Sequence, residues 1–359
     1  MADERQHNVK ETKGLRSQLK KAFGIGSQHM PQSRSNSPTS LVAAPVFTAP
    51  VSPPPSSLPL PAMAIDLKEA AKLRAKYTHF RILVIGRANA GKTTLLKRVC
   101  NTTEEPSIYN EDKNLLKPTS KRGEHNIRHS FTFKSNPGFI FHDSPGFEAG
   151  GEEELKDVMT FIQQCSKAKN VDDQIHVIWF CFDPDVSRPL LPLEKKFFNE
   201  DRAWNVPIVA IFMKFDDLIT QVLDRKKKPE ENMNKALEIL EIEFKQPLSS
   251  YKYQPCAYVH FKAIHKDESN HQEQVGKLIK QTAASIDNLA LKMLFVTVQR
   301  NNLEVCIEYA VNEYIFESTE TIVDLIFKAA SWFGHCYQKY VGVMIRDLDN
   351  FLISNFKGK

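Results

Sequence analysis

A lysine and a threonine directly follow a pair of glycines at a spacing that is typical of phosphate-binding loops. Four residues separate Gly86 from Gly91, and Lys92 and Thr93 come next. Glycines let the backbone curl so that its N–H groups face inward at the start of a helix, where an anion is favoured. In this pattern the lysine reaches the β- and γ-phosphates, and the threonine hydroxyl binds Mg²⁺. The predicted phosphate site consists of Gly86, Arg87, Ala88, Asn89, Ala90, Gly91, Lys92, Thr93 and Thr94.

The segments on both sides of this loop support the same interpretation. The β-branched run at residues 82–85 has the character of a buried strand, and residues 94–96 begin a pattern typical of a helix. A strand before the loop and a helix after it are the context that the phosphate-binding pattern requires. A glycine turn without any ligand is the alternative interpretation.

An aspartate and a glycine follow a second apolar run, at residues 139–141, in the segment Asp143-Ser144-Pro145-Gly146. An aspartate at the end of a strand can hold the Mg²⁺ shell, and the N–H of a glycine three residues later can contact the γ-phosphate. Such a segment reorders when the γ-phosphate leaves, which is the physical basis of a switch. Asp143 is therefore a predicted metal ligand and Gly146 a predicted phosphate contact. An ordinary Asx turn is the alternative.

A lysine and an aspartate, Lys214 and Asp216, follow a third apolar run at residues 208–212. The lysine stem can cover the plane of a base, and the carboxylate can accept from the ring N–H and the exocyclic amine of guanine. Adenine lacks this pair of donors, so a buried Asp216 would be left unpaired and ATP would be rejected. The alternative is a surface Lys-x-Asp at the end of a strand, in which case the chain would be a P-loop ATPase.

The order and spacing of these motifs resemble a small GTPase-type G domain of the translation-factor-related class, over about residues 78–285. The segments HDSPGFEAGG and MKFDD are similar to those of single-G-domain GTP-binding proteins. The resemblance implies GTP and GDP as ligands, Mg²⁺ as cofactor and a protein effector of unknown identity.

The resemblance also implies two further loops. A threonine upstream of the aspartate motif should complete the Mg²⁺ and γ-phosphate contacts; Thr119 fits, and Ser120 or a plain loop hydroxyl are the alternatives. A last base-contacting loop should follow the strand at residues 257–261, where Lys262 and Ala263 are the candidates.

Several positions depart from the family pattern. Met213 stands where an Asn or Thr usually ties the base loop to the phosphate loop. Phe147 stands where many GTPases carry a Gln that orients the attacking water, and the adjacent Glu148 is negative. Hydrolysis should therefore be slow unless another group supplies charge. Arg122 and Arg188 are candidates within the chain, with a solvated surface role as the simpler interpretation.

The loop GRANAGKTT also resembles the phosphate loop GRPNAGKSS of potassium-activated GTPases. In that group the matching asparagine helps to hold K⁺ between the phosphates. The resemblance implies Asn89 as a K⁺ ligand, whereas the alternative is an asparagine that merely tolerates a left-handed conformation. The residues expected to act in hydrolysis are then Lys92, Asn89, Thr119 and Gly146.

Strand-like and helix-like segments alternate around the motifs, which favours an α/β fold with a mostly parallel, doubly wound sheet. Ligands of such sheets bind at the carboxyl ends of the strands, where all three motifs fall. Strands are expected near residues 81–85, 126–133, 139–142, 175–182, 208–212 and 257–261, with a hairpin turn at residues 135–138. Helices are expected near residues 64–77, from the phosphate loop to residue 100, and near residues 152–164, 193–203, 231–245 and 272–284.

Composition divides the chain into three predicted regions. Residues 1–63 are basic and then rich in Pro and Ser, which predicts disorder. Residues 64–285 form the G domain with a leading helix. Residues 286–359 form a helical extension without an apolar run long enough to cross a membrane. Its apolar faces should pack on the G domain, form a homodimer or lie at a membrane surface.

The charge and cysteine content narrow the class of protein. The net charge of +5 gives no case for nucleic acid as the main partner, and six scattered cysteines without a C-x-x-C pair indicate reduced thiols. The absence of an apolar leader favours a cytoplasmic location, with peripheral membrane contact as an option for the Lys-rich start. We expect a GTP-binding switch with slow Mg²⁺-dependent hydrolysis. The alternative is a nucleotide-dependent assembly or membrane-surface scaffold with little hydrolysis.

Overall fold

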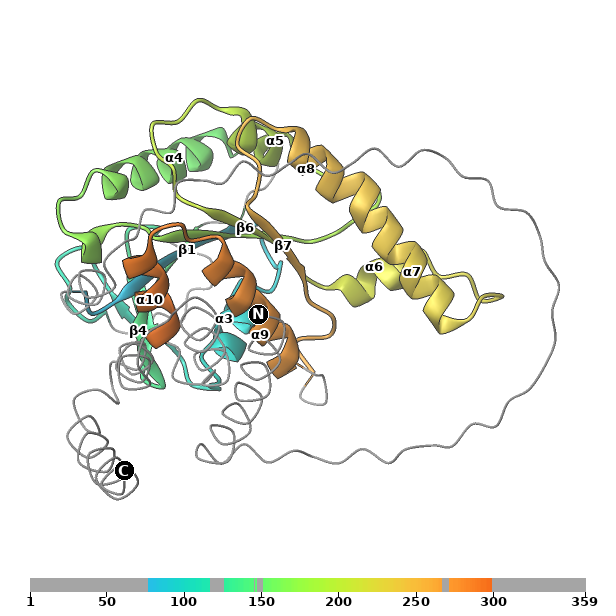
Figure 1. Cartoon of the computed structure of the whole chain (residues 1–359), viewed down its shortest axis with the longest axis horizontal. Coiled ribbons are helices and arrows are strands. Elements are labelled where there is room, and N and C mark those ends of the chain that lie inside the picture. The colour runs from blue at the N-terminus through green and yellow to red at the C-terminus, as the bar shows by residue number, and fades with distance from the viewer. Residues whose placement is uncertain (1–76, 117–125, 145, 147–150, 267–270, 299–359) are drawn as a thin grey trace, which may run out of the picture. The chain divides into compact units, whose positions relative to one another are not determined.

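The computed structural model describes residues 77–116, 126–144, 146, 151–266 and 271–298 (Figure 1). Within these ranges one sheet has the strand order β2-β3-β4-β1-β5-β6-β7. The strands are β1 (Phe80–Gly86), β2 (Ser107–Tyr109), β3 (Ser130–Phe133), β4 (Asn136–Asp143), β5 (Val177–Phe182), β6 (Ile208–Phe212) and β7 (Ala257–His260). From β4 to β7 all neighbouring strands are parallel, and β3 and β2 continue the sheet as antiparallel strands.

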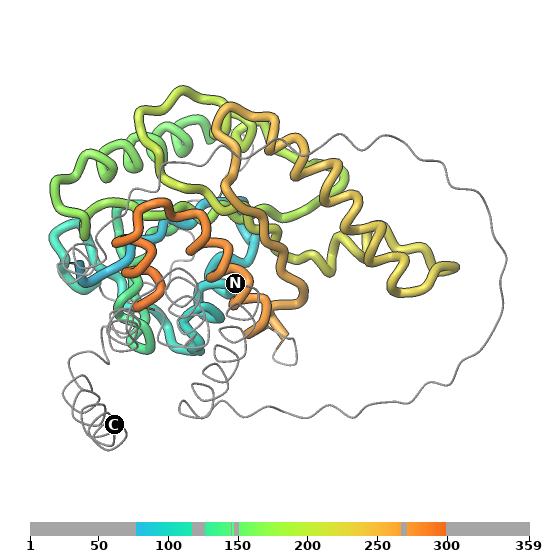
Figure 2. Tube along the Cα trace, in the orientation of Figure 1, coloured from blue at the N-terminus to red at the C-terminus, as the bar shows by residue number. Residues whose placement is uncertain are grey.

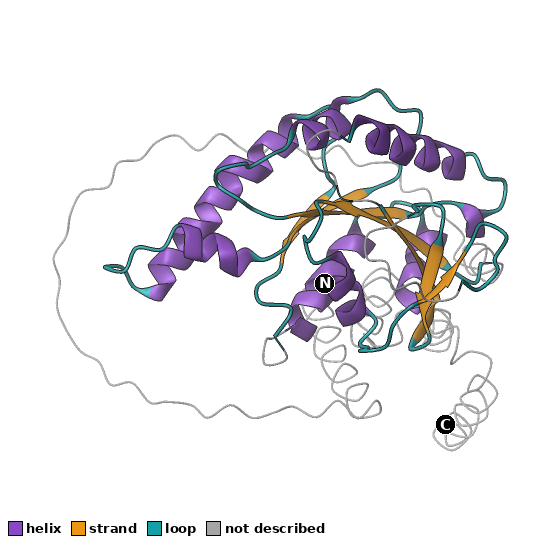
Figure 3. Ribbon diagram, turned by 180° about the vertical axis from the view of Figure 1, so that it is seen from behind, coloured by secondary structure: helices purple, strands orange, loops and turns teal. Residues whose placement is uncertain are grey.

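Helices cover both faces of this sheet (Figures 1 and 3). Alternate residues of β1 belong to two separate clusters of buried side chains, as Ile82 and Leu83 illustrate. The Ile82 face packs against α3 (Lys92–Val99), α9 (His271–Ala284) and α10 (Leu289–Thr297). The Leu83 face packs against α4 (Glu152–Ser166), α5 (Pro192–Asn199), α6 (Phe215–Gln221), α7 (Pro229–Ile239) and α8 (Gln246–Ser250). The predicted α/β class with a mostly parallel, doubly wound sheet is confirmed.

The carboxyl ends of the parallel strands meet at one edge of the sheet. The register places Val84 beside Asp143, Gly86 beside Cys181, and Phe182 beside Phe212. Each of the three predicted motifs begins at one of these strand ends. The sheet therefore brings together segments that lie far apart in the sequence, as doubly wound folds do.

The predicted hairpin is present, but its turn does not span the expected residues 135–138. Phe133 pairs with Asn136, so the turn is limited to Lys134 and Ser135, and β4 already begins at Asn136. Gly138 lies inside β4, and a Cβ placed on it would come within 2.9 Å of the Val298 side chain. The glycine thus permits close packing after α10 and does not mark a turn.

Several helices also differ from the expectation. The short strand β2 and helix α6 had no predicted counterpart; β2 has only three residues, and α6 begins at Phe215, inside the base motif, with Asp216 in its first turn. The predicted helix at residues 231–245 is part of a longer run at residues 229–250 (Figure 2), which contains α7, a π-helical stretch at Leu240–Lys245 and α8. Helix α5 ends at Asn199, earlier than expected, because Glu200 is extended.

The described start of the C-terminal extension packs on the sheet. The ring of Phe295 in α10 lies 4.8 Å from that of Phe80 and 5.9 Å from that of Phe139, between centroids. Residues 299–359, on which the expected dimer or membrane surface depends, lie outside the described residues, as do residues 1–76. None of the described helices combines the length and the apolar character that a membrane span needs.

Candidate functional site

The phosphate loop has a backbone conformation that only particular residues adopt easily. Gly86, Asn89 and Gly91 have φ angles of 149°, 59° and 90°. A Cβ on Gly86 would lie 2.0 Å from the carbonyl oxygen of Cys181. Gly91 caps α3 without a side-chain hydrogen bond, and the first turn of α3 contains no acidic residue. The loop therefore presents backbone N–H groups and the positive end of a helix dipole, which together favour a phosphate.

The lysine of the loop lies where the sequence predicts it. The Lys92 Nζ donates to the carbonyl oxygens of Gly86 at 3.3 Å and Arg87 at 3.1 Å, and it lies 4.0 Å from Asp143 Oδ1. Thr93, the next residue, is exposed in the first turn of α3. Lys92 thus lies between the phosphate loop and the carboxylate predicted for Mg²⁺.

The aspartate motif lies directly against the phosphate loop. Asp143 ends β4 beside Val84 of β1. A Cβ on Gly146 would come within 2.4 Å of the Ala88 N atom, so the two backbones are in contact. Thr119, predicted for Mg²⁺, and Phe147 lie outside the described residues. Thr93 and Asp143 are the described residues that would hold Mg²⁺, and their hydroxyl and carboxylate oxygens are ligands that this ion prefers.

His142, next to Asp143, is held neutral by its surroundings. Burial, and to a smaller extent the charge of the nearby Arg81, lowers the pKa of His142 to about 3. The His142 Nδ1 donates to the Ile127 carbonyl oxygen at 2.9 Å, and Nε2 accepts from Arg81 Nη1 at 2.8 Å. The imidazole therefore supports the end of β4 without adding a positive charge beside Asp143.

The two loops predicted to contact the base meet in the structure. The Asp216 Oδ1 accepts from the Ala263 N–H at 2.7 Å, and the Phe215 N–H donates to the Phe261 carbonyl oxygen at 2.8 Å. Lys214 and Ala263 both have positive φ angles, of 50° and 49°. The carboxylate expected to read guanine is thus fixed against the last base loop.

The side chain of Gln274 in α9 holds the other candidate in that loop. Its Oε1 accepts from the Lys262 N–H at 2.7 Å, and its Nε2 donates to the Lys262 carbonyl oxygen at 3.1 Å. The Lys262 backbone is therefore fixed to α9, while its side chain is exposed.

Met213 makes an apolar contact in place of the usual polar link. It is fully buried, and its Cε lies 3.3 Å from the position of a Cβ on Gly91. The thioether side chain therefore packs on the phosphate loop, and Met213 cannot provide the hydrogen bonds of an Asn or Thr.

The sequence did not predict the contacts that the side chains of Arg87, Glu194 and Asp183 make at this edge of the sheet. The Arg87 guanidinium points from the phosphate loop to the segment after β5 and forms a buried ion pair with Glu194, at 2.8 Å. Asp183, the first residue after β5, accepts from the Lys214 Nζ at 2.7 Å. The position of Asp183 at a strand end was the available signal, whereas nothing in the sequence pairs Arg87 with Glu194.

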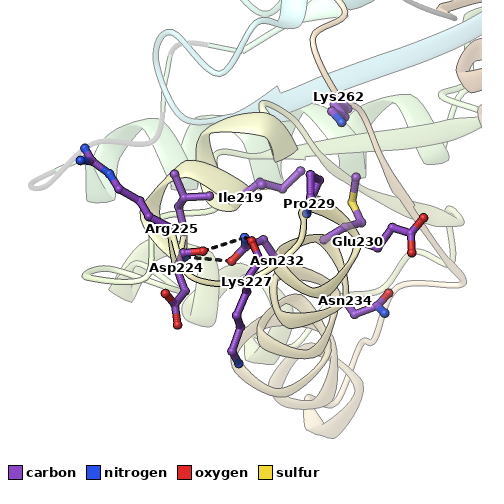
Figure 4. Close-up of a pocket in the computed structure, with 11 residues that line it drawn as sticks. Ile219, Asp224, Arg225, Lys227, Pro229, Glu230, Asn232, Asn234 and Lys262 are labelled. Carbon is purple, nitrogen blue, oxygen red and sulfur yellow. Dashed lines mark hydrogen bonds between the residues drawn. The ribbon is translucent and has the colours of Figure 1, made fainter.

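A cavity of about 590 Å³ lies next to the base loop (Figure 4). It lies between α6 and α7, with the apolar side chains of Ile219, Leu223 and Met233 and the cation of Arg225 in its lining. Lys262 is the single residue of the predicted nucleotide site in the lining. The cavity is therefore a neighbour of the nucleotide site and not the site itself.

A comparison with protein families agrees with the geometry at this edge of the sheet. Residues 81–214 match the family model described as 50S ribosome-binding GTPase. A similar solved structure is that of a mutant NFeoB from S. thermophilus bound to GDP; it is 15% identical, with 74% of this chain and 82% of that chain covered and a TM-score of 0.34. No curated protein matches the chain.

The family match and the strand-end motifs define a P-loop GTPase G domain. This protein therefore contains a GTP-binding domain of the P-loop NTPase class. The ribosome in the family description does not carry over, because one G-domain fold serves many different partners.

Proposed function

We propose that the protein is a GTP-binding switch that hydrolyses GTP slowly with Mg²⁺, and that K⁺ stimulates the hydrolysis. The contact between Gly146 and Ala88 carries this proposal, since it joins the aspartate motif to the phosphate loop. A γ-phosphate bound by the Gly146 N–H has to move this segment relative to Ala88. Binding and loss of that phosphate would therefore change the loop that follows Gly146.

Guanine selection is assigned to Asp216. Its Oδ1 already accepts from Ala263, which supports a carboxylate aimed at the base and fixed in direction. The ring N–H and exocyclic amine of guanine would then be its partners, and adenine would leave it without them.

Arg87 and Arg188 have other partners, and the second candidate of the sequence analysis, Arg122, lies outside the described residues. Arg87 is directed at Glu194, and the Arg188 side chain is 72% exposed and pairs with Asp185 at 3.4 Å. Asn89 is exposed in the phosphate loop and accessible to an ion, which supports its assignment as a K⁺ ligand that replaces an arginine charge in hydrolysis. Its φ angle of 59° is equally expected for the alternative, an asparagine that tolerates a left-handed conformation. Mg²⁺ held by Thr93 and Asp143 would neutralise part of the phosphate charge.

The first test is a competition titration of a fluorescent guanine nucleotide bound to the full chain with Mg²⁺, using GTP and ATP as competitors. We expect strong preference for GTP, loss of this preference in Asp216→Ala, and loss of binding in Lys92→Ala. Asp217→Ala, the exposed neighbour, is the matched control and should behave like the wild type. Equal competition by ATP would contradict guanine selection and support a general P-loop ATPase.

The second test compares GTP turnover in KCl with turnover in NaCl. We expect faster turnover in K⁺, and no difference between the two salts in Asn89→Ala. Equal turnover in both salts would contradict the K⁺ assignment. GTP binding without measurable turnover in either salt would favour the scaffold alternative, which the Phe147 residue in place of a Gln also favours.

A further inference from the structure

Asp183 lies where its carboxylate can hold the side chain of Lys214, the lysine of the base motif. It follows β5 directly, and its carboxylate accepts from the Lys214 Nζ at 2.7 Å. The two side chains are 28% and 34% exposed. Because a lysine side chain has four rotatable bonds, a fixed acceptor for its ammonium group also fixes the path of its stem.

The segment that carries Asp183 is itself fastened to the phosphate loop. The Arg87 Nη1 donates to the Asp183 carbonyl oxygen at 3.1 Å, and Nη2 donates to the carbonyl oxygens of Arg188 at 3.0 Å and Pro189 at 2.9 Å. The Arg87 Nε and Nη2 also bind the two carboxylate oxygens of Glu194, at 2.8 and 3.0 Å. One guanidinium therefore holds both ends of the segment at residues 183–189.

Glu194, whose carboxylate accepts from Arg87, is itself held in place. Glu194 is completely buried in the first turn of α5, and its Oε2 also accepts from the Leu191 N–H at 2.7 Å. On the other side, Gln221 of α6 accepts from the Val186 N–H at 3.0 Å. The segment that begins with Asp183 is thus held by Arg87 of the phosphate loop, by Glu194 of α5 through Arg87, and by Gln221 of α6, unlike a typical exposed ion pair.

We propose that Asp183 is a positioning residue for guanine recognition. It holds Lys214 in place, and Arg87 transmits the position of the phosphate loop to Asp183 through the segment at residues 183–189. This link replaces the polar contact that Met213 cannot make. The inference rests on the proposed binding of guanine nucleotide and adds the residue that orients the lysine.

The test is a double-mutant cycle on the full chain, with affinity for a fluorescent GDP analogue as the readout. The variants are Asp183→Asn, Lys214→Met and their combination; methionine keeps an unbranched stem of similar length but no ammonium group. We expect Asp183→Asn to weaken binding on the order of fivefold to tenfold in the wild-type background. We expect Asp183→Asn to have no further effect when Lys214→Met is already present. Equal weakening by Asp183→Asn in both backgrounds would overturn the proposal.

Two controls separate positioning from a general loss of structure. Asp201→Asn breaks an exposed Lys–Asp pair with Lys252, beyond the opposite ends of the strands, and should leave GDP affinity unchanged. Competition by inorganic tripolyphosphate should be equal in the wild type and Asp183→Asn, because the phosphate loop is intact. Weaker tripolyphosphate binding in Asp183→Asn would mean that the whole site has changed, and would overturn the assignment. A wild type that binds no GDP would instead contradict the proposed function.

Discussion

The phosphate half and the base half of the candidate site are built by different means. In the phosphate half, the positions of the groups follow from backbone conformation, with positive φ angles at Gly86, Asn89 and Gly91. The base half also has positive φ angles, at Lys214 and Ala263, but its side chains are held by one another and by the backbone, since Lys214 is held by Asp183 and Asp216 is fixed against Ala263. The two halves are joined mainly by the Arg87 side chain, which starts in the first half and ends in the second.

This difference explains why the two halves depart from the family pattern to different degrees. Backbone conformation restricts residue type at fixed positions, so a phosphate loop has little freedom to change. A side-chain link can be rebuilt from another position, provided that the same two segments are connected. Met213 is tolerated in the base half because Arg87 and Asp183 connect those segments by another route.

Removing the carboxylate that holds Arg87 should have the largest effect. Glu194→Ala leaves the guanidinium buried without its ion pair and removes the acceptor for the Leu191 N–H. We expect the free energy of unfolding to fall by about 3 to 5 kcal/mol, as is usual when one partner of a buried ion pair is lost. Chemical denaturation measures this change.

Glu152→Ala is the matched control, because Glu152 of α4 forms an exposed ion pair with Lys196 of α5, the helix that also contains Glu194, at 3.2 Å. Glu152→Ala should lower the free energy of unfolding by less than about 1 kcal/mol. A similar loss in both variants would show that the buried pair has no special part in joining the two halves.

A methyl group on the first glycine of the phosphate loop should have the next largest effect. In Gly86→Ala the Cβ would lie 2.0 Å from the Cys181 carbonyl oxygen, at a φ angle of 149°. The backbone has to shift, which should cost about 3 kcal/mol of stability and displace the N–H groups that face the phosphates.

The same substitution in α9 provides the comparison. Gly276 has no atom within 4 Å of an added Cβ, so Gly276→Ala should stabilise the protein by roughly 0.5 to 1 kcal/mol. If backbone conformation sets the structure of the phosphate half, the melting temperature should fall in Gly86→Ala and rise in Gly276→Ala. An unchanged melting temperature in Gly86→Ala would contradict that description.

The sequence predicted the strand, loop and helix of the phosphate half because the constraints on them are local. Gly86 to Thr94 is a single run of residues, and the strand and helix around it are continuous. In the base half the sequence named Lys214, Asp216, Lys262 and Ala263 as residues that follow two strands, but not the side chains that hold them. The links through Asp183 and Glu194 join segments far apart in the chain, and a single sequence gives no measure of such a contact.

Acid should weaken the fold through two buried histidines. Burial lowers the pKa of His142 to about 3 and that of His176 to about 4, below the value of about 6.5 in the unfolded chain. The unfolded chain therefore binds protons that the folded chain does not. The contribution of the two neutral histidines to stability is complete above pH 6.5, and it is lost as the pH falls from 6.5 towards 3 for His142 and towards 4 for His176.

At pH 5 the free energy of unfolding should be lower than at pH 7 by roughly 2 kcal/mol for each histidine. His142→Gln keeps an acceptor for Arg81 and removes the titration, so its stability should fall less steeply in this range. Denaturant titrations of both proteins at pH 7, 6 and 5 measure the difference. Parallel pH profiles would contradict a neutral, buried His142 behind Asp143.

The smallest expected effect comes from restoring the residue that the family pattern has at Met213. Met213→Asn places an amide in a fully buried position against Gly91. We expect the free energy of unfolding to fall by about 1 to 2 kcal/mol, because the amide replaces apolar contacts and its polar groups need hydrogen-bond partners there. Met213→Leu, which stays apolar, should cost less than about 1.5 kcal/mol.

The nucleotide affinity of Met213→Asn tests the comparison most directly. If the path through Arg87 and Asp183 already joins the two halves, an amide at position 213 adds nothing, and the affinity for GDP should stay equal to that of the wild type. An increase of tenfold or more would show that the halves are poorly joined in this chain. The proposed link makes one further prediction. In the Asp183→Asn background, Met213→Asn should recover part of the affinity for GDP that Asp183→Asn removes, since either link alone can hold the base loop to the phosphate loop.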